Sequence, residues 1–153
     1  MGLDMYLKAK KYLSGWNHST PKEKNEFAML RAVAKDVPIC AQAPSGYLEF
    51  NVAYWRKANE IHKWFVENVQ NGADDCGEYY VSREQLEELR EACQAVLNDP
   101  DKAKTVMPTQ SGFFFGSTEY DEYYLKDLRE TVQQVEAALK CPEQWEFEYH
   151  SSW

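Results

Sequence analysis

The sequence lacks the short motifs that mark the common enzymatic chemistries. Its 153 residues include only three histidines and seven glycines. They contain no His-Glu-x-x-His zinc motif, no glycine-rich phosphate loop and no Gly-x-Ser-x-Gly nucleophile motif. The four cysteines form no Cys-x-x-Cys pair, so a dithiol redox site is not indicated. We therefore expect no metal and no cofactor, and a binding protein more than an enzyme.

Long apolar runs are also missing. No stretch approaches the roughly 20 apolar residues that cross a membrane, and the first residues show no charged, apolar and small-residue succession of a secretion signal. The scattered cysteines are then interpreted as reduced thiols. We expect a cytoplasmic protein that does not contact a membrane.

Positive charge is scarce relative to negative charge. Lys and Arg number 17 against 25 Asp and Glu, which gives a net charge of −8. Direct binding of nucleic acid is therefore not expected, because it needs Lys and Arg to displace counterions from phosphates. The same charge allows carboxylates to be presented to a basic partner. Aromatic residues make up 14% of the chain, which favours a recognition surface.

Period-two patterns predict a small sheet in one domain over residues 1–153. Apolar and polar residues alternate over residues 3–9 and again over residues 145–149, so we expect the two terminal strands to share a mainly antiparallel sheet. Tyr47–Asn51 and Glu78–Val81 are two further short strand candidates.

Capping signals and helical periodicity predict about four helices, and hence a compact α+β fold. One begins at Ser19 or Thr20 with Pro21, and we expect it to bury Phe27, Leu30, Val33 and Ala34. A second follows the capping box Ser82–Gln85. A third starts at Ser117 or Thr118, and the fourth covers residues 50–69.

The expected helix over residues 50–69 places two polar side chains on its apolar face. Asn59 and His62 lie one turn apart beside Trp55, and a buried amide or imidazole without a partner costs about 1–3 kcal/mol. They must therefore pair inside the fold, line a pocket or face another chain. The opposite arc holds Arg56, Glu60, Lys63 and Glu67 in positions that suit helix-spaced ion pairs.

Trp64 projects with that charged arc, so we expect either a loop of the same chain or a partner to cover it. A symmetric dimer would be compatible with this helix.

The second feature of the sequence that indicates a site is a segment rich in aromatic residues. Three consecutive phenylalanines, Phe113–Phe115, cannot all point to the core, and Tyr120 and Tyr124 follow near the start of the next helix. Together the two features predict a ligand site of aromatic, amide, imidazole and guanidinium groups. Its expected members are Trp55, Arg56, Asn59, His62, Phe115, Tyr120 and Tyr124.

Asp74 and Asp75 offer a different chemistry. Adjacent acids could hold a divalent ion or act as acid and base with His62. Acids that follow an Asn-Gly turn are more often solvated turn residues, and we expect that role here.

Several segments resemble a group of small, largely uncharacterised proteins encoded by phages and prophages. They are the start Met1-Gly2-Leu3-Asp4-Met5-Tyr6-Leu7, the run Trp55-Arg56-Lys57-Ala58-Asn59 with Ile61-His62 and Trp64-Phe65, and Ser111 through Asp121. The resemblance spans most of the chain and implies a phage origin. Phages carry many small acidic proteins as counter-defence factors, some of which sequester nucleotide signals while others block an immune protein.

By analogy of origin we expect a counter-defence protein that sequesters a small nucleotide-like immune signal in the bacterial host cytoplasm. One alternative is an acidic protein–protein inhibitor of a host defence complex, including a nucleic-acid mimic of the anti-CRISPR kind. The other is a small hydrolase that uses His62 with Asp74 or Asp75.

Overall fold

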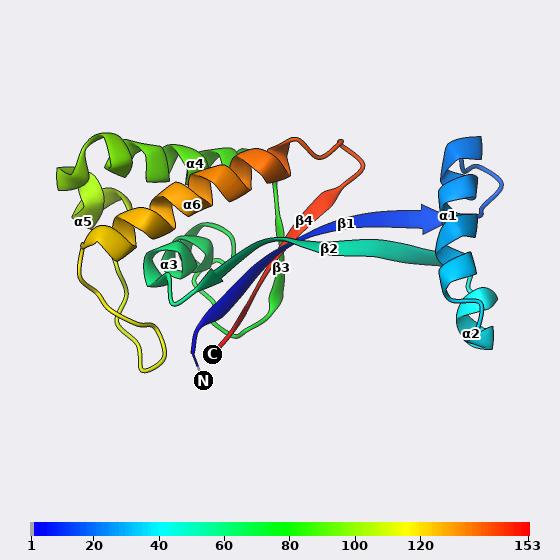
Figure 1. Cartoon of the computed structure of the whole chain (residues 1–153), viewed down its shortest axis with the longest axis horizontal. Helices are drawn as coiled ribbons and strands as arrows, with labels where there is room; N and C mark the ends of the chain where they lie inside the picture. The colour runs from blue at the N-terminus through cyan, green and yellow to red at the C-terminus, as the bar shows by residue number, and fades with distance from the viewer. Residues whose placement is uncertain (1) are drawn as a thin grey trace. The chain divides into compact units, whose positions relative to one another are not determined.

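A single antiparallel sheet organises the computed structural model, which describes residues 2–153 (Figure 1). Its strands are β1 (Asp4–Ser14), β2 (Ser45–Arg56), β3 (Glu78–Val81) and β4 (Glu146–Ser152), in the order β2–β1–β4–β3. Because β1 lies beside β4, the expectation that the two terminal strands share a sheet is confirmed.

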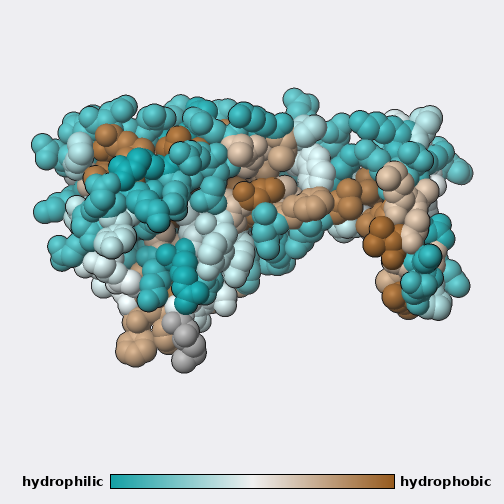
Figure 2. Space-filling model, viewed as in Figure 1, coloured by the Kyte–Doolittle hydropathy of each residue, from teal (hydrophilic) through white to brown (hydrophobic). Residues whose placement is uncertain are grey.

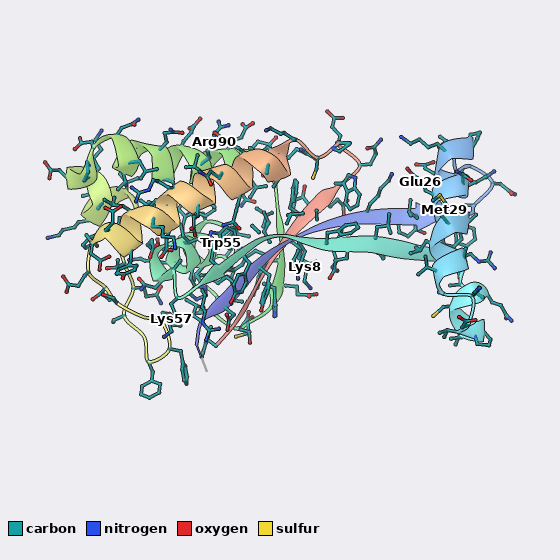
Figure 3. The ribbon with its side chains drawn as sticks, viewed as in Figure 1. Lys8, Glu26, Met29, Trp55, Lys57 and Arg90 are labelled. Atoms are coloured by element: carbon teal, nitrogen blue, oxygen red, sulfur yellow. The ribbon has the colours of Figure 1, made fainter. Side chains whose placement is uncertain are left out.

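The alternation of apolar residues explains these strands. Every second residue of β1 from Met5 to Ala9 is buried, as are Phe147 and Tyr149 in β4, because successive side chains of a strand point to opposite faces. Lys8, on the other face, lies 2.5 Å from Glu78 and 4.0 Å from Glu148 (Figure 3). Lys8 thus meets an acid on the neighbouring strand β4 and another on β3, the next strand beyond it.

Six α-helices and one 3-10 helix occur in the described chain, where about four helices were expected. The long ones are α1 (Pro21–Val33), α3 (Asn59–Asn68), α4 (Arg83–Asn98) and α6 (Glu122–Leu139), and the short ones are α2 (Pro38–Ala41), η1 (Pro100–Lys102) and α5 (Ala103–Val106). Helices α4 and α6 run side by side (Figure 1). The short helices fall in segments that carry no helical periodicity, which is why the sequence did not predict them.

The capping signals place two helix starts correctly and one incorrectly. Thr20 caps α1 and Ser82 caps α4, each through a capping box. Helix α6 begins at Glu122, not after Ser117 or Thr118, because the Asp121 carboxylate accepts hydrogen bonds from the first amides of the helix. An aspartate at this position satisfies amides that would otherwise have no partner.

The helix expected over residues 50–69 is wrong in its first half. Residues up to Arg56 belong to β2, and α3 begins only at Asn59. Val52, Tyr54 and Trp55 are β-branched or aromatic residues that suit a pleated strand, and a short apolar run cannot be assigned by helical periodicity alone. Asn59 and His62 therefore share α3, while Trp55 comes from the sheet.

Two compact units emerge from the contacts within the chain. One comprises the residues up to Ala9 together with Asn51–Trp153, and it contains the main hydrophobic core of sheet, α3, α4 and α6. The other comprises Lys10–Phe50. Strands β1 and β2 contribute residues to both. That residues 1–153 behave as one folding domain stays a prediction.

The Lys10–Phe50 unit leaves many large apolar side chains exposed. Phe27 is buried as expected, but Val33 is 86% exposed, so its predicted place on the buried stripe of α1 is wrong. Met29 and Ile39 are exposed as well, and hydrophobic residues gather over α1 and α2 in Figure 2. Among the four residues expected to be buried, only Phe27 is fully buried, whereas Leu30 and Ala34 are half-buried and line a cavity with it.

Within residues 2–153, no helix has the length and apolar character that crossing a membrane requires.

Candidate functional site

Most of the predicted site residues lie in the interior. Trp55, Asn59, His62, Phe115 and Tyr124 expose 6% of their surface or less, whereas Arg56 and Tyr120 are exposed. Asn59, His62 and Phe115 come together in one buried layer. Arg56 and Tyr124 instead line an open cavity. That these seven residues bind a ligand stays a prediction.

Asn59 has all its hydrogen-bonding groups occupied. Its amide nitrogen donates to the main-chain oxygens of Phe115 (3.1 Å) and Ser117 (2.7 Å), and its side-chain oxygen accepts from the amide of Gln110 (2.8 Å). These bonds hold the segment 110–117 against the start of α3. The polar group on the apolar face is thus explained by pairing within the fold.

His62 is also paired on both ring nitrogens. Its Nε2 lies 3.2 Å from the Asp74 carboxylate, and its Nδ1 lies 2.8 Å from the Tyr149 hydroxyl. Because a carboxylate only accepts, Nε2 carries the hydrogen and donates to Asp74, while Nδ1 accepts from Tyr149. Asp74 also accepts from the Trp153 indole at 3.1 Å. The network joins α3, the loop before β3 and the C-terminal strand.

The electrostatics of His62 favour an uncharged ring. Burial lowers its pKa, and the neighbouring Asp74 carboxylate opposes that shift. The pair needed for the hydrolase alternative is therefore present, but the His62 side chain is fully buried, so a substrate would reach it only if this layer opened. Asp75 accepts from the amide of Gly77 at 2.9 Å and from the Tyr79 hydroxyl, which is the behaviour of a turn residue.

The other aromatic residues of the predicted site form hydrogen bonds that connect neighbouring segments of the chain. The Trp55 indole donates to the Thr131 hydroxyl at 2.9 Å, which ties β2 to α6 (Figure 3). The Tyr124 hydroxyl donates to the main-chain oxygen of Met107 at 2.8 Å. The Tyr120 hydroxyl accepts from the amide of Thr109 at 3.2 Å. Each polar end of a ring thus finds a partner in a neighbouring segment.

A cavity of about 280 Å³ opens at the point where β2 turns into α3. Its walls come from the end of β2, the turn, the first turn of α3, the segment 116–121 and the start of α6. The lining residues are Arg56, Lys57, Glu60, Gly116, Ser117, Glu119, Asp121, Tyr123, Tyr124, Lys126 and Asp127. We call it the turn cavity.

Two backbone features shape the turn cavity. Lys57 adopts a left-handed conformation with φ of 60°, and its amide donates to the main-chain oxygen of Leu3 at 2.8 Å (Figure 3). Gly116 has φ of 88°, and a Cβ at this position would lie 3.2 Å from the Lys57 oxygen. Only glycine tolerates both the angle and the close approach without strain.

Glu60 is the most unusual group in the turn cavity. It is only 3% exposed, and among residues 2–153 no hydrogen-bond partner reaches its Oε1. Burial raises the pKa of Glu60 to about 8, and the charges of Asp127 and Asp121 act in the same direction. At neutral pH it is therefore mainly an uncharged acid, with one hydroxyl donor and one carbonyl acceptor. It also lines a second cavity of about 240 Å³ beside Trp64.

Charges of both signs surround this acid. Arg56, Lys57 and Lys126 bring positive charge, whereas Glu119, Asp121 and Asp127 bring negative charge. Burial, together with the charge of Glu130, raises the pKa of Asp127 to about 6. The tyrosine ring at position 123 is 78% exposed, so it can offer a face to a planar ligand.

The expectation of a charged outer arc on the central helix needs correction. Glu60 was placed there beside Lys63 and Glu67, and only the last two form the expected ion pair, at 3.8 Å. Trp64, placed with the same arc, is 8% exposed and lines a cavity together with Met107 and Pro108. Because α3 begins at Asn59, its faces are assigned correctly only once the end of β2 is known.

The sequence interpretation did not assign Glu60, Lys126 or Asp127 to the site. A signal for Glu60 was available, because the β-branched and aromatic residues before Arg56 favour a strand and put Glu60 in the first turn of a helix. Lys126 and Asp127 gave no signal, since charged residues on an amphipathic helix usually face solvent.

No group of three or more His, Cys, Asp and Glu side chains in residues 2–153 has the arrangement of a metal site. Comparison of the chain with family models, curated proteins and solved structures found no match.

Proposed function

We propose that this protein binds and sequesters a small nucleotide-like ligand in the turn cavity. The observation that carries the proposal is the buried carboxyl of Glu60, which lines a cavity together with basic residues and whose Oε1 has no hydrogen-bond partner among residues 2–153. Buried polar groups are almost always hydrogen-bonded, and a ligand would supply the partner that Glu60 lacks.

The chemistry of the lining suits the parts of a nucleotide. Arg56 and Lys126 can pair with phosphate oxygens, the ring of Tyr123 can stack on a base, and Glu60 can bond to the base edge through its donor and its acceptor. Glu119 and Asp121 disfavour a highly charged polyphosphate. The proposal is therefore for a ligand with few phosphates.

The size of the cavity narrows the ligand further. Small-molecule sites usually measure about 300–1,000 Å³, and the turn cavity, at about 280 Å³, is at the small end. One nucleotide unit suits such a volume better than an extended oligonucleotide. A cyclic dinucleotide would leave part of itself outside the cavity.

The buried layer contributes rigidity to this site. Asn59 ties the segment that ends at Ser117 to α3, and Trp55 ties β2 to α6 through Thr131. Walls that are fixed before the ligand arrives lose less entropy on binding. In this proposal Asn59 and Trp55 hold the site without touching the ligand.

The biological role rests on the resemblance to phage proteins. We propose that sequestration lowers the concentration of an immune signal in the cytoplasm of a bacterial host, which is a counter-defence role. Sequestration requires that the ligand leaves unchanged, so recovery of intact ligand distinguishes this role from hydrolysis.

The experiment is binding of linear and cyclic mono- and dinucleotides, followed by thermal shift and isothermal titration. A ligand at a hundred times its dissociation constant adds about 2.7 kcal/mol to the free energy of unfolding. We expect a shift with a mononucleotide-sized ligand, its recovery unaltered, and binding about tenfold to a hundredfold weaker in Arg56→Ala, because a charge-assisted hydrogen bond contributes about 1.5–3 kcal/mol.

The matched control is Arg90→Ala, since Arg90 lies on α4 (Figure 3). It should bind as the wild type does. The absence of any shift across the panel, or equal weakening by both substitutions, would count against the turn cavity as a nucleotide site.

The charge distribution favours one second candidate, an acidic inhibitor of a host protein. Residues 10–50 hold only four of the 25 acidic residues, and α4 exposes Glu84, Glu87, Glu88 and Glu91. Such a face suits a partner with a basic surface. A partner bound this way should be released by salt and should not bind a variant in which these four glutamates are glutamines. Salt-resistant capture would exclude that mode of binding.

A further inference from the structure

Helix α1 is apolar on two faces although only one of them is buried. Phe27, Leu30 and Ala34 line a cavity within the Lys10–Phe50 unit. Met29 and Val33 are 64% and 86% exposed and lie on a different side of the helix, roughly a third of a turn away, because residues are spaced about 100° apart around its axis. A surface helix normally has polar residues on its outer face, so the outer face of α1 requires an explanation.

The outer face of α1 also carries several small side chains. Asn25, Ala28 and Ala32 are exposed on it next to Met29 and Val33. Small side chains let a second helix approach closely. Met29 and Val33 can then pack into the spaces beside the small side chains of that second helix. An exposed helix face of mainly apolar residues marks an interaction site more often than a solvated face.

The charges at the two ends of the outer face identify its partner. Lys22 lies seven residues before Met29, and Asp36 lies seven residues after it, just beyond the end of the helix. Both are exposed. A basic residue in the first turn and an acidic residue after the last turn oppose the dipole of their own helix. Their placement is therefore unfavourable for α1 alone.

We propose that α1 pairs antiparallel with α1 of a second copy of this chain, about a twofold axis at Met29. In that register Lys22 of one copy faces Asp36 of the other, and the symmetry repeats the pair at the opposite end. The two helix dipoles then run in opposite directions, so the unfavourable end charges become favourable. A parallel pairing would instead put like charges together.

The pairing is expected to be weak on its own. A helix of 13 residues is about 20 Å long, and two such helices bury less than the area of a standard interface. Val37 and Ile39, also exposed, extend the apolar surface beyond α1. We expect a dissociation constant on the order of micromolar.

The test measures molecular mass by sedimentation over about 1 to 100 µM. Wild type should pass from monomer to dimer in this range. Val33→Glu should be monomeric throughout, because it buries a charge at the contact. Lys22→Glu and Asp36→Lys should each weaken the dimer about tenfold, and the double variant should recover wild-type association, since it restores both ion pairs with reversed sign.

Phe113→Glu serves as the matched control, because it changes a fully exposed apolar residue outside the Lys10–Phe50 unit, and it should dimerise normally. Circular dichroism shows whether each variant keeps its helices. A wild type that stays monomeric at 100 µM, roughly the top of the range, overturns the proposal. So does a dimer that Val33→Glu leaves intact, or a double variant that is no tighter than the single ones.

Discussion

At the scale of single residues, Glu60 couples the candidate site to pH. Its pKa in the folded protein is about 8, against the ordinary value that it has in the unfolded chain. A raised pKa means that its contribution to stability is complete below the unfolded pKa and is lost as pH rises through about 8. His62 acts in the opposite direction, because its lowered pKa makes stability fall as pH decreases.

We therefore predict that Glu60→Gln stabilises the protein at alkaline pH. Glutamine keeps the shape and the carbonyl acceptor and replaces the hydroxyl donor by an NH₂ group, but it cannot ionise. A tenfold difference in proton affinity between the folded and unfolded states corresponds to about 1.4 kcal/mol. Because the folded pKa of about 8 lies well above the ordinary value of 4.5, the gain should grow with pH and level off above the folded pKa, at up to about 5 kcal/mol. Urea unfolding across the pH range measures it, and the effect of His62 cancels because both proteins contain it.

Glu67→Gln on the same helix is the control for this change. Its side chain is 57% exposed, so the difference from wild type should be small and nearly independent of pH. An equal gain from both substitutions, or a gain for Glu60→Gln that shrinks as pH rises, would show that Glu60 is not a buried neutral acid.

The residues of the site show what sequence reasoning can reach. It identified Asn59 and His62 as polar groups that need partners. It named Asp74 with His62 only as a catalytic alternative and expected a solvated turn residue, whereas Asp74 lies 3.2 Å from His62 Nε2 and also accepts from Trp153. It could not find the partners of Asn59, the main-chain oxygens of Phe115 and Ser117, because every residue has such an oxygen and no sequence pattern marks the ones that are used. Long-range pairing of this kind is decided by the fold.

At the scale of elements, the turn between β2 and α3 depends on a glycine from another segment. Gly116 has φ of 88°, and a Cβ there would lie 3.0 Å from the Lys57 Cβ and 3.2 Å from its oxygen. We predict that Gly116→Ala destabilises the protein by about 2–3 kcal/mol, through backbone strain and the forced shift of the turn. Chemical denaturation measures the loss.

A second glycine separates the two causes. Gly72 has φ of 82°, and within the described chain no heavy atom beyond its immediate neighbours lies within 4 Å of a Cβ built there. Gly72→Ala should therefore report the backbone strain alone, about 1 kcal/mol. If both alanine variants lose the same stability, the contact between Gly116 and Lys57 does not shape the turn.

Elements with local signals were predictable and those that depend on packing were not. Thr20 and Ser82 start their helices as expected, because a capping box is a contact between residues three apart. The residues before Arg56 were misassigned because their apolar character suits a helix as well as a strand, and what makes them a strand is the pairing with β1. Val33 was misplaced because only the fold shows which apolar stripe of α1 is covered.

At the scale of the whole molecule, charge is unevenly divided. Residues 10–50 carry six of the 17 basic residues but only four of the 25 acidic ones, so all of the excess negative charge belongs to the rest of the chain. The glutamates at positions 84, 87, 88 and 91 are exposed on one helix, α4. Like charges one turn apart on a helix repel one another.

We predict that salt stabilises this protein. Raising the ionic strength from about 0.05 M to about 0.5 M shortens the Debye length to a few ångströms, which screens repulsion between exposed acids more than it weakens buried contacts. The urea midpoint should rise, by an amount equivalent to about 1 kcal/mol. In the variant with glutamine at these four positions the rise should be smaller and the low-salt stability higher. A midpoint that falls with salt would mean that exposed ion pairs such as Lys126–Glu130, at 3.5 Å, outweigh the repulsion. The acidic face of α4 would then not destabilise the protein, and a basic partner would gain no stabilisation by neutralising it.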